Sequence, residues 1–357
     1  MLFLPDLVQI TAELLRQIPR GKVTTYKSIA IALGDKLATR IVPSLLASHK
    51  DEANSLTHKV VQSDGTVTGK TEEERTQKIR LLQAENIFVI DGHVAPLEKF
   101  LFRNFKCDAP LVKLQRLQLE AKEKLSLRAE QASYKTIGGI DLSYAGSLGI
   151  ATYVSVELQA KKLLISQTEA QQVKFPYIPS YLAFRELPAM LALMQKLKTE
   201  NKLAEITLVD GNGTLHHRHA GIACQLGVLL DVATIGITKS LLYGRAEKDL
   251  QKLQPGEVCY IEADGQKLGA AFQSKPKTEP FFISPGHKID LETAIEIARA
   301  CLGEGRLPEP IQLAHDASQE AAQSYKSKPT SQKKTLGENR SSTQKARNVQ
   351  RGLFDKA

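Results

Sequence analysis

The chain has 357 residues, of which 42% are hydrophobic and 24% charged, and its formal net charge at pH 7 is +9. This composition is typical of a globular protein, and the length predicts about two domains. No apolar run is long enough to span a bilayer and no signal peptide follows Met1, so we expect a cytoplasmic protein without a membrane partner. The four cysteines are widely spaced, which indicates neither a zinc site nor a disulfide framework.

Residues 1–105 are predicted to form a small, mostly helical domain. Two of its helices are joined by a turn of two or three residues, which is typical of a helix-turn-helix. Helical spacing of apolar residues, with Thr or acidic residues at the starts, predicts these helices: "DLVQITAELLRQI", "TTYKSIAIALG", "DKLATRIVPSLLASH" and "EEERTQKIRLLQAEN".

Residues 106–133 are predicted to be a helical linker or the start of a second domain, which extends over 134–325. Three strand-like runs open this domain, and helices then alternate with buried strands, a pattern that predicts a mixed α/β sheet. The predicted strands are "YKTIGGIDLSYAG", "GIATYVSVEL", "KKLLISQTEAQQV", "EITLVDG", "ATIGITKS" and a hairpin over "GEVCYIEADGQKLGAAFQS". The predicted helices are "SYLAFRELPAMLALMQKLKTE", "HAGIACQLGVLLD" and "DLETAIEIARACLG".

Three carboxylates and a histidine in this domain suggest a metal site. Asp141 lies in the first strand and Asp210 ends a strand that should be central. A carboxylate in an apolar strand costs several kcal/mol unless it is paired or metal-bound. Glu186 lies early in the long helix and His287 just before another helix, so four segments could supply ligands to Mg²⁺ for phosphodiester hydrolysis. Alternatively, each Asp could be a turn former and Glu186 a solvated helix residue.

Five motifs in this domain resemble endonuclease V. They are "GGIDLSY" (138–144), "FPYIPSYLAFRE" (175–186), "VDGNGTLHHRHAGIA" (209–223), "TIGITKSLLYG" (234–244) and "SPGHKIDLETA" (284–294), and the likeness covers about 110–315. The resemblance implies an RNase H-like fold and Mg²⁺-dependent nicking, with Mn²⁺ as a substitute. The cut falls at the second phosphodiester 3′ of a deaminated base, above all hypoxanthine, and leaves a 3′-hydroxyl and a 5′-phosphate.

The resemblance also assigns roles to single residues. Lys239 matches a lysine that lies near the scissile phosphate, and His216 matches a histidine at the phosphate or leaving group. His217 and His219 stand where the family has Pro and a basic residue, and we interpret them as part of a basic face. The resemblance implies that the metal ligands and other acidic-site residues are Asp141, Glu186, Asp210 and His287.

The segment "PYIP" resembles the wedge with which the family fills the gap left by an extruded base. Tyr177 is its aromatic residue, and Ser180 stands where the family has Gly, so the base preference is open. Gly211 and Gly213 are expected to let the backbone approach the substrate. The residues implied in base or DNA binding here are Pro176, Tyr177, Ile178, Pro179, Ser180, Leu182, Gly211 and Gly236.

The first domain resembles the winged-helix-like DNA-binding domain of O-6-alkylguanine-DNA alkyltransferases, through "IPRGKVTTYKSIA" (18–30) and "LTHKVVQSDG" (56–65). The reactive Cys of that family is Thr57 here, so the likeness is closer to alkyltransferase-like proteins, which bind lesions without alkyl transfer. Tyr26 matches the residue that rotates the phosphate of the target nucleotide, and Arg40 matches the arginine that fills the space left in the base stack. His58 and Glu85 match the relay to the missing Cys, and Pro43 should kink the recognition helix.

The last 32 residues, 326–357, are basic and have little to bury, so we expect a disordered tail that favours polyanions. Gln350, Leu353 and Phe354 match the spacing of the peptides that bind the bacterial sliding clamp. The sequence thus predicts a monomeric DNA-repair endonuclease that binds damaged double- or single-stranded DNA. Two alternatives stay open: a ribonuclease specific for inosine, and a catalytically silent lesion-binding protein.

Overall fold

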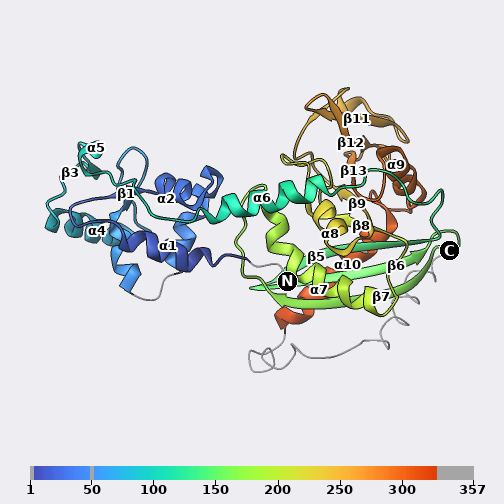
Figure 1. The fold of residues 1–357 in the computed structure, drawn as a ribbon, viewed down its shortest axis with the longest axis horizontal. Helices are drawn as coiled ribbons and strands as arrows, with labels where there is room; N and C mark the ends of the chain where they lie inside the picture. Colours follow the sequence, from blue (N-terminus) through green and yellow to red (C-terminus); the bar gives the residue numbers. More distant parts are fainter. Residues whose placement is uncertain (1–3, 49–51, 328–357) are drawn as a thin grey trace. The chain divides into compact units, whose positions relative to one another are not determined.

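The computed structural model describes residues 4–48 and 52–327, which form two compact units (Figure 1). The first unit comprises Met1–Arg116 with Lys174–Tyr181, and the second comprises Leu117–Val173 with Leu182–Ala357. The predicted linker 106–133 is therefore divided between the units. Segment 174–181, expected in the second domain, groups with the first unit. Within the described ranges, no helix is both long and apolar enough to cross a membrane.

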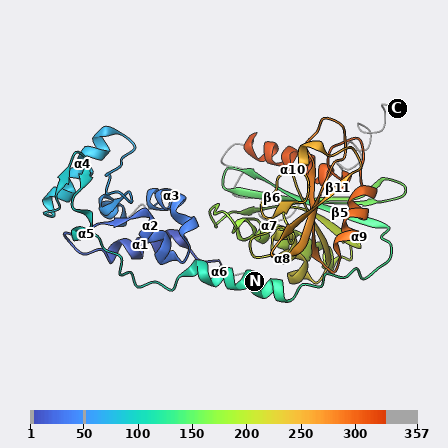
Figure 2. The same ribbon diagram turned by 90° about the horizontal axis from the view of Figure 1, so that it is seen from above.

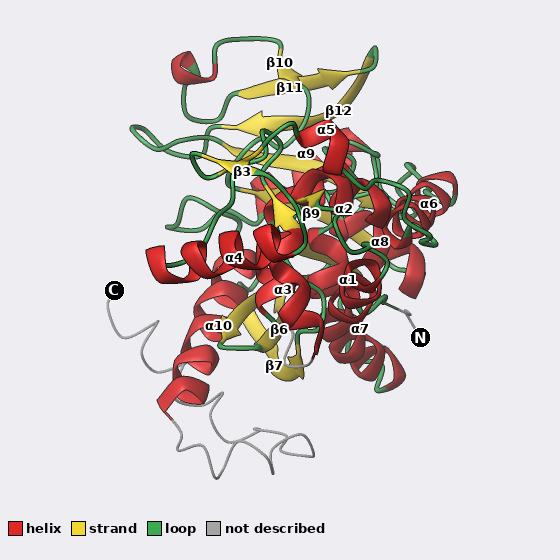
Figure 3. Cartoon of the chain, turned by 90° about the vertical axis from the view of Figure 1, so that its left-hand side faces the viewer, coloured by secondary structure: helices red, strands yellow, loops and turns green. Residues whose placement is uncertain are grey.

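Short helices dominate the first unit (Figure 3). Their starts follow from side-chain caps, since Asp6, Thr25 and Thr71 each accept a backbone N–H of the first turn. The helices are α1 (Leu7–Arg16), α2 (Tyr26–Leu33), η1 (Lys36–Arg40), α3 (Val42–Ala47), η2 (Glu52–Lys59), α4 (Glu72–Ala84), α5 (Leu97–Phe100) and α6 (Pro110–Glu123), which continues into the second unit. The strand pairs are β1 (Thr24–Thr25) with β2 (Val60–Val61), and β3 (Val89–Ile90) with β4 (His93–Val94).

The predicted recognition helix is broken in two. The 3₁₀ helix η1 ends at Arg40, and α3 begins at Val42 with Pro43 in its first turn. A proline has no N–H to donate and fits only the first turn of a helix, so Pro43 starts a new helix instead of kinking a continuous one.

In the described part of the chain, the second unit is built on a nine-stranded sheet of order β10-β11-β12-β13-β9-β8-β5-β6-β7. The three predicted strands at its start form an antiparallel meander, and β8 and β9 run parallel to β5. The predicted mixed α/β sheet is thereby confirmed. The strands are β5 (Thr136–Ala145), β6 (Leu148–Glu157), β7 (Lys162–Gln172), β8 (Ile206–Asp210), β9 (Ala233–Thr238), β10 (Arg245–Ala246), β11 (Val258–Ala263), β12 (Gln266–Phe272) and β13 (Phe281–His287).

Helices cover both faces of this sheet. Helices α7 (Leu182–Thr199) and α8 (Ile222–Leu230) lie on one side and α10 (Glu309–Ser327) on the other (Figure 2). Helix α9 (Leu291–Ala300) shares a buried cluster with α10, in which Ile295 and Ile311 pack with Ile137 and Leu208 of the strands. A short 3₁₀ helix, η3 (Leu250–Lys252), follows β10. Helix α10 and the strand β13 were not among the sequence predictions.

Candidate metal centre and nucleic-acid interface

Asp141 and Asp210 lie side by side on neighbouring parallel strands. The ladder between β5 and β8 ends with Ile140 opposite Val209, so each aspartate is the first residue of its strand beyond that ladder. Asp141 is buried. Its carboxylate, the carboxylate of Asp210 and the imidazole of His315 each offer one ligand atom, and these three atoms lie within 4.8 Å of one another. Carboxylate oxygens with an imidazole nitrogen are a donor set that suits a divalent cation.

Helix α10 supplies two of the partners of Asp141. The hydroxyl of Ser318 donates to Oδ2 of Asp141 at 2.7 Å, and Nδ1 of His315 lies 3.1 Å from the same oxygen. Sequence reasoning missed His315 because it missed the helix. The signal was present: buried Ile311, Ala314, Ser318 and Ala322 recur at helical spacing.

Glu186 reaches the aspartates from α7 and is buried at 9% exposure. Burial raises its pKa to about 7, and the charges of Asp141 and Asp210 add to the shift. The phenol of Tyr144 donates to Oε1 of Glu186 at 2.9 Å, which stabilises the carboxylate in part. The folded chain disfavours the ionised form of Glu186, and a bound cation would stabilise that form.

Asp210 is affected in the same way. Burial and the neighbouring Asp141 raise its pKa to about 6, against the opposing charges of Lys239 and His315. Burial and the charge of Asp141 thus disfavour the ionised forms of both Glu186 and Asp210. A divalent cation would offset these effects, so the residues present fit the predicted metal site.

His287, predicted as a metal ligand, lies elsewhere in the sheet. It is opposite Thr234 of β9, which pairs with Thr207 of β8, whereas Asp210 lies three residues further along β8. Two strands across and three residues along amount to roughly 10 Å in each direction, too far for one ion. Its Nδ1 accepts the N–H of Ser126, and its Nε2 lies 3.5 Å from Asp231. The histidine that lies with Asp141 and Asp210 is His315.

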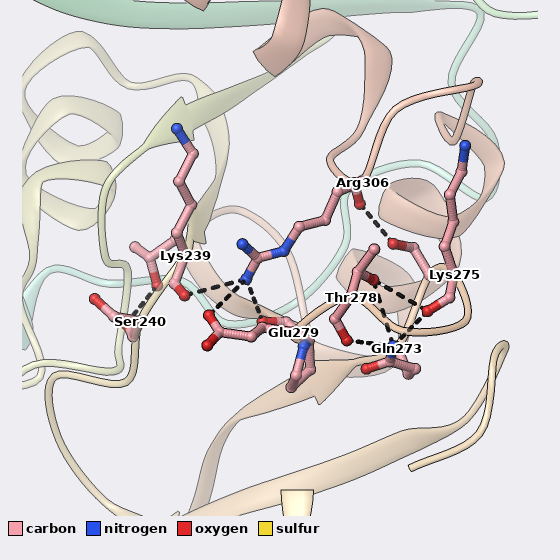
Figure 4. A network of polar contacts seen from close by, with 10 residues as sticks. Lys239, Ser240, Gln273, Lys275, Thr278, Glu279 and Arg306 are labelled. Atoms are coloured by element: carbon pink, nitrogen blue, oxygen red, sulfur yellow. Dashed lines mark hydrogen bonds and ion pairs between the residues drawn. The ribbon is translucent and has the colours of Figure 1, made fainter. Parts of the chain in front are cut away.

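Lys239 follows β9 and is exposed at the same end of the sheet as Asp210. Its main chain is held by Arg306, whose guanidinium donates to the carbonyls of Lys239 at 3.3 Å and Pro280 at 2.7 Å (Figure 4). The carbonyl of Arg306 in turn accepts the hydroxyl of Ser274 at 2.7 Å. Arg306 thus fixes the backbone from which the Lys239 ammonium extends, a role that no sequence motif indicated.

The three clustered histidines differ in environment. His216 is buried, and its Nδ1 accepts the N–H of Arg218 at 3.1 Å. His219, expected on a basic face, is instead buried and lies 3.0 Å from Asp264, which also accepts the phenol of Tyr243. His217 is exposed, with its ring 4.8 Å from that of Tyr243. Only His217 keeps the exposed position that the sequence analysis expected.

The glycines of this loop serve packing within the chain. A Cβ on Gly213 would lie 2.1 Å from the carbonyl oxygen of Pro285, and one on Gly236 would lie 2.2 Å from the Gly213 nitrogen. Gly211 has a φ of +154° and donates to the Ile237 carbonyl. These contacts within the chain already require glycine at Gly213 and Gly236, and the expected role in substrate approach stays a prediction.

The wedge residues Pro176, Tyr177, Ile178, Pro179 and Ser180 all lie in the first unit. Tyr177 is 59% exposed, whereas Ile178 is fully buried. Ser180 has a φ of +66°, which is the left-handed region that favours glycine and accounts for the family's Gly. Leu182, 37% exposed, begins α7 in the second unit. The predicted clamp residues Gln350, Leu353 and Phe354 lie outside the described residues.

The relay residues of the first unit are paired. His58 is buried with Nε2 3.2 Å from Glu85, which also binds Lys59 at 3.0 Å and accepts the Gly21 N–H at 2.8 Å. These contacts lower the pKa of Glu85 against the opposing effect of burial. Tyr26 begins α2, with its hydroxyl 3.1 Å from Thr68, and Arg40 is exposed at the end of η1.

Comparison with known proteins agrees with this two-part organisation. The family model for endonuclease V matches residues 118–316, and the model for the DNA-binding domain of 6-O-methylguanine DNA methyltransferase matches residues 8–87. The chain belongs to the endonuclease V family. The "Bifunctional methyltransferase/endonuclease" of Picrophilus torridus is 34% identical over 87% of this chain and 95% of its own length.

Solved endonuclease V structures resemble the second unit. The catalytic domain of human endonuclease V has a TM-score of 0.58 and 29% identity, over 62% of this chain and 98% of that chain. An endonuclease V of Ciona intestinalis was solved with a 23mer DNA containing an inosine followed by a ribo-adenosine. It has a TM-score of 0.54 and 29% identity, over 62% of this chain and 100% of that chain. This chain is therefore a DNA-repair nuclease joined to a further DNA-binding domain.

Glu186→Gln is expected to stabilise the metal-free protein at pH 8 by roughly 1–3 kcal/mol, because it removes a buried charge. Glu186 has its pKa raised from 4.5 to about 7, so the destabilisation is absent below pH 4.5, grows between the two values and is complete above pH 7. Urea unfolding in EDTA at pH 4.5 and pH 8 measures it, with the exposed Glu320→Gln as control. Equal stability of wild type and variant at pH 8 would contradict the assignment.

Arg306→Met should lower kcat of nicking about tenfold with little change in KM, since it releases the backbone of Lys239 and not a substrate contact. Arg306→Lys keeps one donor and should recover part of the rate. Steady-state kinetics on one nuclease substrate, together with melting temperatures, separate this effect from unfolding. A Met variant with the wild-type kcat would show that Lys239 needs no such support.

Proposed function

We propose that this endonuclease V nicks DNA at the second phosphodiester 3′ of a deaminated base, with deoxyinosine as the main substrate, and leaves a 3′-hydroxyl and a 5′-phosphate. The observation that carries the proposal is the convergence of Asp141, Asp210 and Glu186 with His315 beside Lys239. The inosine-containing DNA bound by the Ciona intestinalis relative supports the choice of base.

Asp141 and Asp210, with His315, would hold Mg²⁺, and Mn²⁺ should serve as a substitute. The bound ion supplies Lewis-acid stabilisation of phosphate charge and a nucleophile at neutral pH. Ser318 holds Oδ2 of Asp141 in place, which fixes the orientation of that ligand. Glu186 completes the acidic set from α7, on the other face of the sheet from α10.

Two cationic or donor groups act on the phosphate in this proposal. Lys239 offers a point charge next to Asp210, where the scissile phosphate would lie. His216, which its motif assigns to the phosphate or leaving group, would be the second of these groups, and its Nδ1 accepts the Arg218 N–H. The exposed ring of Tyr177 would fill the stack after base extrusion.

The first unit is proposed to bind DNA without accepting alkyl groups. Thr57 stands at the reactive position, and a Thr hydroxyl lacks the thiolate character that attack on an alkyl carbon needs. The carboxylate of Glu85 is bound by three donors, which are His58, Lys59 and the Gly21 N–H, and together they stabilise its ionised form. Arg40 and Tyr26 would contact the DNA.

Asp141→Asn and Asp210→Asn should each reduce Mg²⁺-dependent nicking of an inosine duplex by at least a thousandfold, while binding of that duplex stays measurable. The exposed Asp316→Asn on α10 is the matched control. Gel assays on duplexes with inosine, uracil or O-6-methylguanine, and on inosine-containing RNA, test the substrate at the same time. Full activity of Asp210→Asn would refute the metal site, and faster cleavage of RNA would favour the ribonuclease alternative.

No methyl group should pass from O-6-methylguanine DNA to the protein, since Thr57 replaces the reactive Cys. Incubation with DNA labelled on the methyl group, followed by counting of the protein fraction, measures transfer. A stoichiometric protein adduct would refute the proposal that the first unit accepts no alkyl group.

Tyr26→Ala combined with Arg40→Ala should weaken DNA affinity about tenfold and leave the single-turnover nicking rate at saturating enzyme unchanged.

A further inference from the structure

Three side chains from distant parts of the sequence meet inside the first unit. The hydroxyl of Tyr181 donates to Oδ2 of Asp35 at 2.7 Å, and Nε2 of Gln115 lies 2.6 Å from that hydroxyl and 3.0 Å from the same carboxylate oxygen. Tyr181 is fully buried. A buried phenol needs a partner, and a bond to a carboxylate is stronger than one to a neutral acceptor. We refer to Asp35, Gln115 and Tyr181 as the tyrosine bridge.

Asp35 also makes a capping hydrogen bond in the turn between α2 and η1. Its Oδ1 accepts the N–H of Leu37 at 2.8 Å and so caps the 3₁₀ helix that ends at Arg40. Gly34 before it has a φ of +107°, and a Cβ there would lie 2.9 Å from the backbone nitrogen of Val112, so α6 packs closely on this turn. One carboxylate therefore holds both the start of η1 and Tyr181.

The loop that Tyr181 closes carries the wedge. Phe175 and Ile178 are buried on either side of Tyr177, which is 59% exposed. Ser180 keeps its left-handed φ of +66° directly before Tyr181, a conformation that a non-glycine residue holds only when its surroundings impose it. The bridge is thus the polar anchor at the end of a strained loop whose exposed residue is Tyr177.

We propose that Asp35 and Gln115 are positioning residues for base capture, because they fix Tyr181 and through it the loop that presents Tyr177. This inference rests on the proposed function for its kinetic consequence. The anchoring of the loop itself does not depend on what the enzyme cleaves.

Two variants of the full-length chain isolate the bridge. Tyr181→Phe removes one hydroxyl and keeps the buried ring. Asp35→Ser keeps an N-cap for η1 but is too short to reach Tyr181. Tyr260→Phe is the matched control, because it removes a phenol that donates to a carboxylate, that of Glu292, at 2.9 Å in the second unit.

Hydrogen exchange measures the anchoring without any substrate. We expect peptides that cover 174–181 to exchange about tenfold faster in Tyr181→Phe and Asp35→Ser than in wild type and Tyr260→Phe. Unchanged exchange in both variants overturns the proposal whatever the activities are. Because this measurement needs no DNA, it stays decisive if the enzyme proves not to act on deoxyinosine.

Single-turnover nicking of an inosine duplex measures the consequence. The enzyme concentration at half-maximal rate should rise about fivefold to tenfold in both variants, because a less firmly anchored loop captures the base less well, while the rate at saturation stays within twofold. Affinity for undamaged duplex should not change. Faster exchange with an unchanged half-saturating concentration would overturn the positioning role, and so would an equal loss in Tyr260→Phe.

Discussion

The placing of carboxylates away from water, at Asp141 within β5, at Asp210 at the end of β8 and at Glu186 on α7, is the constraint on which the rest of the structure depends. Burial raises the pKa of Glu186 and of Asp210, and the charge of the neighbouring Asp141 adds to both shifts. A fold does not retain such a cluster for stability, since apolar residues of similar size would pack at these positions without the penalty. The cluster has the arrangement of a cation site.

The surrounding elements hold this cluster against its own repulsion. Parallel pairing of β5 and β8 places the two aspartates next to each other on neighbouring strands, and α10 adds Ser318 and His315 to Asp141. Helix α7 brings Glu186 from the other face, with Tyr144 as its donor. The catalytic function that we propose therefore depends on residues from both helical layers, which explains why the relevant motifs are spread over most of the second unit.

Sequence reasoning found the strand carboxylates because a charge in an apolar strand is anomalous wherever the strand lies. It assigned the histidine wrongly, because the order of motifs along the chain does not give the register that separates His287 from Asp210. Helix α10 escaped because Ala314, Ser318 and Ala322 form a weak apolar stripe. The grouping of 174–181 with the first unit could not be predicted either, since the bonds of Tyr181 to Asp35 and Gln115 join residues far apart in the sequence.

The location of the ion tests the central claim most directly. We would crystallise the wild-type enzyme with Mn²⁺ and record anomalous diffraction near the manganese edge, which places the metal without reference to activity. We expect one peak within about 2.5 Å of carboxylate oxygens of both Asp141 and Asp210, on the side of His315. A peak at His287 and Asp231, or none at the aspartates under saturating Mn²⁺, would contradict the metal centre described above.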